Sequence, residues 1–124
     1  SINDAVLLIK QNRIVECNSK AIEIFGSIRE KILKHPLYEF SPSTQPDGKN
    51  SEEKMLKLIS ETLKGIPQYF ELLLRKADGS TFNAEIRLNK VEFSGSQFIQ
   101  TIIRDITESK NTHEAIRQSG KNLD

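Results

Sequence analysis

The amino-acid sequence predicts an α+β fold in which helices cover one face of an antiparallel sheet. Short apolar segments with the composition of strands occur at the start of the chain and again through its last third, and the clearest helical periodicity lies between them. In the last third, apolar and polar residues alternate, which indicates strands with one buried and one solvated face. A chain of 124 residues is long enough for one such domain with its own core.

Two short strands are predicted near the start of the chain. Residues 5–9 form an apolar run, and residues 13–17 form a second run rich in β-branched side chains. Lys10, Gln11 and Asn12 lie between the two runs as turn residues. This pattern predicts a β-hairpin.

A helical region is expected after the hairpin. Asn18 or Ser19 is suited to cap a helix over residues 20–25, and Gly26 is placed to end it. A second short helix is expected over residues 28–33.

Residues 35–50 break every regular period, because three prolines and an Asp-Gly pair fall within them. An irregular insert of this length inside a compact domain is usually functional or mobile. The clearest helix then begins at Ser51 and ends before Gly65 and Pro67. One face of that helix is expected to consist of Met55, Leu58, Ile59, Thr62 and Leu63.

Three further strands are predicted at residues 68–76, 81–91 and 97–106. The Asp78-Gly79 pair supplies the positive φ that a tight turn between the first two requires. The set expected to face the core is almost wholly apolar and consists of Phe70, Leu72, Leu74, Phe82, Ala84, Ile86, Leu88, Ile99, Thr101 and Ile103. The opposite set is mostly polar and consists of Glu71, Leu73, Arg75, Asn83, Glu85, Arg87, Gln100, Ile102 and Arg104.

Composition narrows the classes of function. The formal net charge is +1 and no more than two like charges occur in succession, so we expect neither a nucleic-acid partner nor direct contact with a membrane. No apolar run approaches the roughly 20 residues of a membrane span. Cys17 is the single cysteine and only His35 and His113 accompany it, so no metal-ligand set is expected and a reducing, cytoplasmic location is favoured.

Several ordered motifs carry a family resemblance. They are Asn18, Ala21 and Phe25-Gly26; Phe40-Ser41-Pro42 with Gln45-Pro46-Asp47-Gly48; Phe70-Glu71, Arg75, Asp78-Gly79 and Phe82; and Asp105-Ile106-Thr107. In this order and spacing they resemble the PAS domain family over residues 5–107. The resemblance implies a five-stranded antiparallel sheet in the order 2-1-5-4-3, a helical flank, and a pocket between the two. It also implies sensory signal transduction, commonly upstream of a histidine kinase, as in two-component systems, or of a cyclic-dinucleotide output domain.

The apolar sheet face is predicted to be either a filled core or the wall of a ligand pocket, which residues 36–50 would gate. Thr101 carries the only hydroxyl on that face and is therefore the candidate to hydrogen-bond a small ligand. The candidate pocket residues are Phe40, Met55, Leu58, Leu72, Leu74, Ala84, Ile86, Thr101 and Ile103.

Neither flavin nor haem is expected as a cofactor. Members of the family that bind flavin place amide side chains at positions that match Leu74, Ala84 and Ile103, and all three are apolar here. Photochemical members need a cysteine near the helix before the long central helix, whereas Cys17 lies in the second predicted strand. Residues 51–64 contain no histidine to serve as the axial ligand of the family's haem sensors.

Catalysis is not expected, because no short motif brings together a nucleophile, a base and an orienting group.

The outward sheet face contains candidates for an interface. Tyr69, Leu73 and Ile102 place apolar side chains among its charges, and they are the candidates for an interface in a homodimer or with another helix.

The end of the last strand is the candidate for signal transmission, through Asp105, Ile106 and Thr107. The Asp105 carboxylate can accept hydrogen bonds where strand turns into helix and can pair with Arg75 or Lys76. A linker helix is expected over residues 108–124, after a sensor domain at residues 1–107. Its weak coiled-coil seam consists of Thr112, Ile116, Ser119 and Leu123.

The sequence thus predicts a sensory domain that binds a small ligand or partner and relays the change through its C-terminal helix to an output domain in the same chain. The alternative is a dimerisation and relay module with a packed interior and no ligand.

Overall fold

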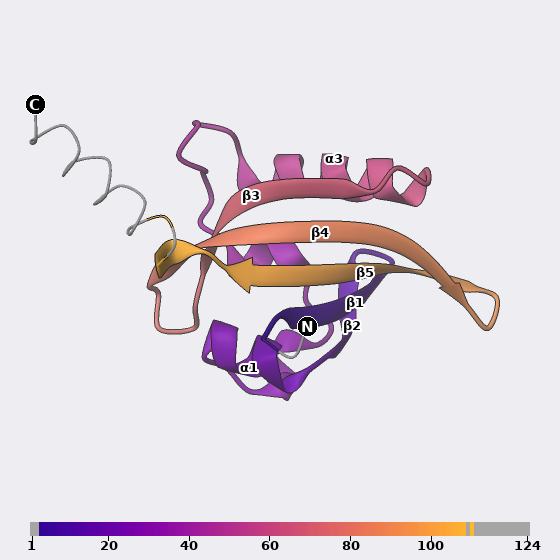
Figure 1. Ribbon diagram of the computed structural model, residues 1–124, viewed down its shortest axis with the longest axis horizontal. Helices are drawn as coiled ribbons and strands as arrows, with labels where there is room; N and C mark the ends of the chain where they lie inside the picture. Colours follow the sequence, from indigo (N-terminus) through magenta and orange to yellow (C-terminus); the bar gives the residue numbers. More distant parts are fainter. Residues whose placement is uncertain (1–2, 109, 111–124) are drawn as a thin grey trace, which may run out of the picture.

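The computed structural model describes residues 3–108 and 110, which form a five-stranded antiparallel sheet with the helical segments on one face (Figure 1). The elements are β1 (Ala5–Lys10), β2 (Arg13–Cys17), α1 (Ser19–Phe25), α2 (Arg29–Ile32), the 3₁₀ helix η1 (Leu37–Phe40), α3 (Ser51–Leu63), β3 (Gln68–Arg75), β4 (Thr81–Phe93) and β5 (Ser96–Asp105). The strand order β2-β1-β5-β4-β3 confirms the predicted sheet and the α+β class. Most of the predicted linker helix, with its seam, lies outside the described residues.

The N-terminal hairpin forms as expected, with a turn at Gln11 and Asn12 that adopts positive φ angles of 51° and 63°. Asn18, rather than Ser19, caps α1, and its Oδ1 accepts from the backbone N–H of Ala21 at 3.1 Å. The same oxygen accepts from the N–H of Val6 at 3.0 Å. Asn18 therefore begins α1 and also fixes that helix to β1.

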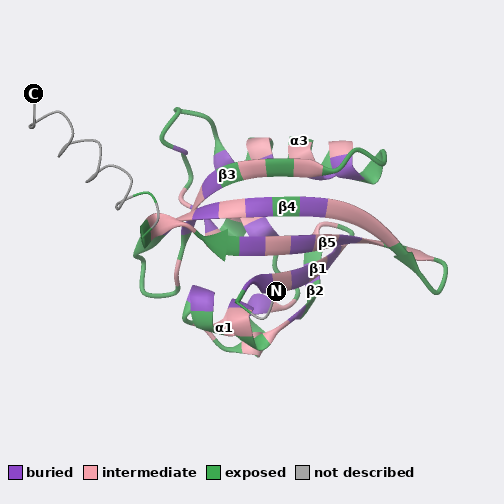
Figure 2. Cartoon of the chain, in the orientation of Figure 1, coloured by how far each residue is buried: buried purple, intermediate pink, exposed green. Residues whose placement is uncertain are grey.

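The core lies between the inner face of the sheet and the helical segments. Of the ten residues predicted to face inward from β3, β4 and β5, nine are buried, and Phe70 is half-buried and packs against the core. Figure 2 shows the resulting alternation of buried and more exposed residues along β4 and β5. The two-residue period of a strand, which places alternate side chains on opposite faces, is the cause.

The predicted face of α3 is largely correct. Asn50 caps the helix through a hydrogen bond from the N–H of Glu53 at 3.0 Å, and Met55, Ile59 and Thr62 are buried at helical spacing. Leu63 was expected on this face but is 42% exposed. It lies about 100° around the helix from Thr62, beside the buried stripe instead of within it.

The segment expected to be irregular has more order than its prolines indicate. It contains η1 and an isolated bridge between Thr44 and Asn50. Backbone hydrogen bonds replace regular periodicity, with the N–H of Gln45 donating to the carbonyl of Lys49 at 2.8 Å and that of Ser51 to the carbonyl of Ser43 at 2.9 Å. The backbone groups of this segment thus satisfy one another in turns, without a regular helix or sheet.

The β4–β5 hairpin is longer than predicted, because β4 continues to Phe93 and β5 starts at Ser96. Beyond the pairs Gln68–Leu88 and Ile9–Ile99, neither β3 nor β1 continues beside it. The hairpin therefore ends in a two-stranded ribbon, which projects at the right of Figure 1. Across the part of the chain that is described, no helix is long and apolar enough to cross a membrane.

Candidate functional site

The candidate pocket residues come together on the inner side of the sheet. Seven of them are buried in the core: Met55, Leu72, Leu74, Ala84, Ile86, Thr101 and Ile103. Phe40 and Leu58 are partly buried and pack against this cluster. Most of these residues therefore form one wall on β3, β4 and β5, which faces α3 and η1. Their side chains pack together and fill the space between the sheet and these helices.

An aromatic cluster joins this wall to η1 and α1. The ring centroids of Phe25 and Phe40 lie 4.9 Å apart, and those of Phe25 and Phe82 lie 6.2 Å apart. Phe25 and Phe82 were not among the candidate pocket residues, although both belong to the family motifs. Phe40 thus contacts the core immediately before residues 41–50. We name this segment the Gln45 loop.

Thr101 is the polar exception on the inner face. Its side chain is fully buried, and its Oγ1 has no hydrogen-bond partner among residues 3–108 and 110. A buried hydroxyl without a partner costs about 1–3 kcal/mol, because its hydrogen bonds to water are lost and not replaced. This atom is therefore available to a hydrogen-bonding group that enters the core.

The three transmission candidates form a hydrogen-bonded turn at the end of β5, which we name the exit junction (residues 105–107). The Oδ1 of Asp105 accepts from the N–H of Thr107 at 2.9 Å. The N–H of Ile106 donates to the carbonyl of Asn83 at 2.9 Å, and the N–H of Asn83 donates to the Oγ1 of Thr107 at 2.8 Å. The junction is thus attached to β4 through Asn83, a residue that the sequence analysis placed only on the outward face.

Asp105 does not form the cation pair that the sequence suggested. Arg75 donates instead to the carbonyl of Glu39 at 3.4 Å, and the ammonium of Lys76 lies 5.7 Å from the ring centroid of Phe82. In the described residues, the Asp105 carboxylate accepts at the start of the helix at Thr107, in the manner of a helix cap.

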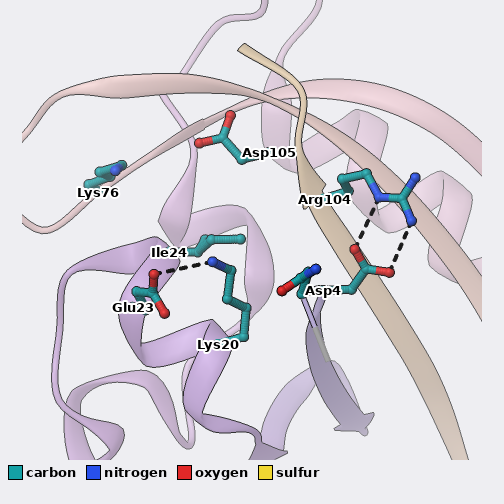
Figure 3. Close-up of a pocket in the computed structure, with 8 residues that line it drawn as sticks. Asp4, Lys20, Glu23, Ile24, Lys76, Arg104 and Asp105 are labelled. Carbon is teal, nitrogen blue, oxygen red and sulfur yellow. Dashed lines mark hydrogen bonds and ion pairs between the residues drawn. The ribbon is translucent and has the colours of Figure 1, made fainter. Parts of the chain in front are cut away.

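A charged cleft of about 410 Å³ lies beside the exit junction, between α1 and the ends of β1 and β5 (Figure 3). On its wall, Asp4 forms a two-point ion pair with Arg104, at 3.1 Å to Nε and 3.3 Å to Nη2. Across it, Lys20 pairs with Glu23 at 3.2 Å. The hydrogen bond from Arg104 lowers the pKa of the buried Asp4 carboxyl below its usual value, so this group stays ionised.

The Asp4–Arg104 pair joins the first strand to the last. Sequence analysis missed it because Asp4 precedes the first apolar run and lies 100 positions from Arg104. No local pattern connects two residues so far apart in the chain.

Two of the three interface candidates lie in one row across the outer face. Tyr69 is opposite Arg87, and Arg87 is opposite Ile102. The Arg87 guanidinium lies 4.9 Å from the centroid of the Tyr69 ring, which is 61% exposed. Leu73 is opposite Asn83, two rows away, so it does not belong to the same patch.

The remaining chemically active side chains have local roles. The Nδ1 of His35 lies 3.1 Å from the Oε2 of Glu39, one helical turn away. Cys17 is buried, and this burial raises the pKa of its thiol. In the described ranges, no three histidine, cysteine or acidic side chains lie close enough to share a metal ion.

The strand order, the helical segments on one sheet face and the helical turn that follows the last strand define a class of α+β domain. A family model for the PAS domain matches residues 3–108, and the chain belongs to this family. PAS domains are sensor domains rather than catalytic ones, and they occur in signalling proteins.

An uncharacterized protein from Azorhizobium caulinodans is 25% identical over 118 residues, which are 95% of this chain and 16% of that protein. The PAS domain of an HTR-like protein from Haloarcula marismortui has a TM-score of 0.69 at 23% identity and covers 83% of this chain and 86% of its own. The PAS domain of nitrogen regulation protein NR(II) from Vibrio parahaemolyticus has a TM-score of 0.67 at 15% identity, with 86% and 92% covered. The two structural likenesses show the fold alone.

Proposed function

We propose that this domain is a cytoplasmic sensory module that binds a small, mostly apolar ligand against the inner face of its sheet and relays binding through the exit junction to an output domain in the same chain. The observation that carries the proposal is the buried Thr101 hydroxyl without a described partner. A ligand with one carbonyl or hydroxyl group would supply the missing hydrogen bond, and its apolar part would match Leu74, Ile86 and Ile103. The apolar character of Leu74, Ala84 and Ile103 argues against flavin, whose ring edge requires polar partners.

Access to the inner face is proposed to involve the Gln45 loop and η1. A cleft of about 340 Å³ lies between η1, the first residues of this loop and the start of α3, lined among others by Tyr38, Ser41 and Ser51. Phe40 is only partly buried, so rotation of its ring away from Phe25 would open the core from this side. A ligand in that position would replace packed side chains and would therefore shift the loop.

Native mass spectrometry of the chain purified without added ligand tests the proposal. A bound mass that is present in the wild type and absent in Thr101→Val is the expected result, because valine keeps the shape but cannot hydrogen-bond. A matched control is Thr62→Val, since Thr62 is also buried but its Oγ1 already donates to the carbonyl of Leu58 at 2.8 Å. Absence of any bound mass in all three proteins contradicts a resident ligand.

A ligand-free dimerisation and relay module is the second candidate, and the filled core favours it. Met55, Leu74, Ile86 and Ile103 are fully buried side chains that leave the inner face closed. In that case Thr101→Val removes an unsatisfied hydroxyl and should raise the free energy of unfolding by about 1 kcal/mol. If a ligand pairs with Thr101, the same change should lower the stability of the purified complex, since bound ligand stabilises the folded state.

A homodimer is proposed through the Tyr69–Ile102 row of the outer face. Tyr69→Ser should weaken self-association about tenfold while leaving the monomer folded, because an exposed aromatic anchor contributes little to the monomer. Ile28→Ser is the control, as Ile28 is 55% exposed but lies between α1 and α2. Sedimentation equilibrium measures the dimer dissociation constant of each variant, and equal constants for Tyr69→Ser and Ile28→Ser would refute this interface.

A further inference from the structure

Gln45 has an unusual position for a glutamine in a loop, since it is only 4% exposed and its side chain bonds to the edge of the sheet. The N–H of Leu73 donates to its Oε1 at 2.8 Å, and its Nε2 donates to the carbonyl of Leu73 at 3.0 Å. A neighbouring strand would pair with Leu73 through one N–H and one carbonyl in the same way. The Gln45 amide thus takes the place of a sixth strand at one residue of the edge strand β3.

The same residue fixes the conformation of its own loop. Its Nε2 also donates to the Oγ of Ser51 at 2.9 Å, and that hydroxyl donates to the carbonyl of Pro42. Its backbone carbonyl accepts from the N–H of Gly48 at 2.9 Å. Because a single side chain joins the loop, the first residue of α3 and β3, the loop cannot move without breaking the contact with Leu73.

The row occupied by Leu73 leads directly to the exit junction. Leu73 is opposite Asn83, and its N–H and carbonyl face Gln45, so the two residues form a non-hydrogen-bonded pair. The N–H and carbonyl of Asn83 therefore face the other way, where they bond to Thr107 and Ile106. One row of the β3–β4 pair is thus held by the loop on one side and by the exit junction on the other.

A second contact joins Lys110, in the helix that begins at Thr107, to β3 near the Leu73–Asn83 row. Lys110 forms an ion pair with Glu71 at 3.0 Å, and Glu71 is opposite Glu85 in the sheet, so the cation offsets a like-charge pair. A cleft of about 170 Å³ lies where these parts meet, lined among others by Gln45, Leu73 and Lys110. In Figure 1, the loop before α3 and the end of β5 lie at the same end of the sheet.

We propose that Gln45 is the positioning residue through which the Gln45 loop controls the start of the helix that begins at Thr107, by holding the Leu73–Asn83 row to which the exit junction is bonded. The inference rests on the proposed relay function and names its route. Phe40 immediately precedes the loop and packs on Phe25, so a displaced Phe40 pulls on Gln45. Release of the amide frees Leu73, and the change reaches Ile106 and Thr107 through Asn83.

Amide hydrogen exchange of the labelled chain, measured by NMR without ligand, tests this route. In Gln45→Ala, the Leu73 amide should exchange about tenfold faster because its acceptor is lost, and the Ile106 amide should exchange about threefold faster because its acceptor on β4 becomes less fixed. Leu7 in β1 serves as the reference for global opening, so the decisive quantity is the ratio of the Ile106 rate to the Leu7 rate. Gln97→Ala is the control, since that exposed side chain donates to Glu92 at 3.4 Å, in the β4–β5 ribbon and away from the exit junction.

The ratio of the Ile106 to the Leu7 exchange rate still tests the proposal if Gln45→Ala lowers the overall stability, because the Leu7 rate records global opening. Gln45→Glu keeps the length and the acceptor for Leu73 but removes both donors and places a carboxylate against the Leu73 carbonyl, so it should also raise the Ile106-to-Leu7 ratio, whatever the global opening that the Leu7 rate records. Coupling is reciprocal, and Thr107→Val should therefore accelerate exchange at Leu73. An unchanged ratio in both Gln45 variants, or a Leu73 rate unaffected by Thr107→Val, means that Gln45 only caps the sheet edge and overturns the proposal. Because no ligand is used, this result is independent of whether Thr101 binds one.

Discussion

The inner face of the sheet and the end that carries the exit junction are held together by different forces. On the inner face, residues such as Leu72 and Ile86 are stabilised by removal of apolar surface from water, which does not depend on one particular neighbour. At the end of the sheet that carries the exit junction, Gln45 and Asn83 each make a few hydrogen bonds with defined partners. Each of these contributes about 0.5–1.5 kcal/mol, so this end of the sheet can change state at a small cost while the core stays intact.

The largest expected effect separates the two regions directly. Leu72→Ala or Ile86→Ala should lower the free energy of unfolding by about 2–5 kcal/mol, because each leaves a cavity in the filled core. Leu73→Ala, one position along β3 and half-buried on the other face, should cost less than about 1.5 kcal/mol. Urea denaturation measures all three, and losses below about 0.5 kcal/mol for both core variants would contradict a packed inner face.

A smaller effect is expected for the pair that joins β1 to β5. Asp4→Asn should cost about 1–2 kcal/mol, since the carboxylate is buried but its partner Arg104 is half exposed. Glu23→Gln is the matched control in the same cleft, because its side chain is 72% exposed and should contribute less than about 0.5 kcal/mol.

The pH dependence of the Asp4 contribution has a defined sign. The pKa of Asp4 is lowered in the folded state, so the group adds stability above its unfolded pKa of about 3.9 and loses it as the pH falls towards the folded value. The difference in stability between wild type and Asp4→Asn should therefore be constant near neutral pH and shrink below about pH 4. A difference that grows on acidification would rule out this ion pair as its source.

A change at the exit junction should have little effect on folding and a large one on signalling. Asp105→Asn keeps an oxygen that can accept from Thr107, so the free energy of unfolding should fall by no more than the loss of a helix cap, about 1 kcal/mol, and the melting temperature should change little. If the charge biases the junction between two states, the parent protein should lose or lock its response to stimulus. Output activity of the parent protein carrying Asp105→Asn, measured with and without stimulus, distinguishes the two roles. Normal switching at unchanged stability assigns Asp105 a capping role only.

The smallest expected signal is spectroscopic. The purified domain should show no absorbance band at visible wavelengths, because Leu74, Ala84 and Ile103 are fully buried apolar side chains and α3 contains no histidine. A visible chromophore in a one-to-one ratio with the chain would require metal-binding contacts, or polar contacts beyond Thr101, that the proposed binding site does not include, and it would contradict this prediction.

Features that depend on neighbours in the chain could be predicted from the sequence alone. Alternation along β4 identified Phe82, Ala84 and Ile86 as inward residues, because a strand places every second side chain on the same face. The helix cap, narrowed to Asn18 or Ser19, and the turn at Asp78-Gly79 were recognised for the same reason, since local backbone geometry selects those residue types. These patterns together were sufficient for the elements, the α+β class and the inward face of the sheet, whereas the strand order was expected from the family resemblance.

Contacts between distant residues were decided only by the tertiary structure. Gln45 is 28 positions from Leu73, and Asp4 is 100 positions from Arg104, so neither pair has a spacing that a helix or strand period could reveal. Their meeting depends on strand order and on register, because a shift of one residue would turn Leu73 towards the core and Asn83 away from Thr107. Hydrogen bonds and ion pairs require defined partners at short distance, whereas hydrophobic burial requires only the correct face.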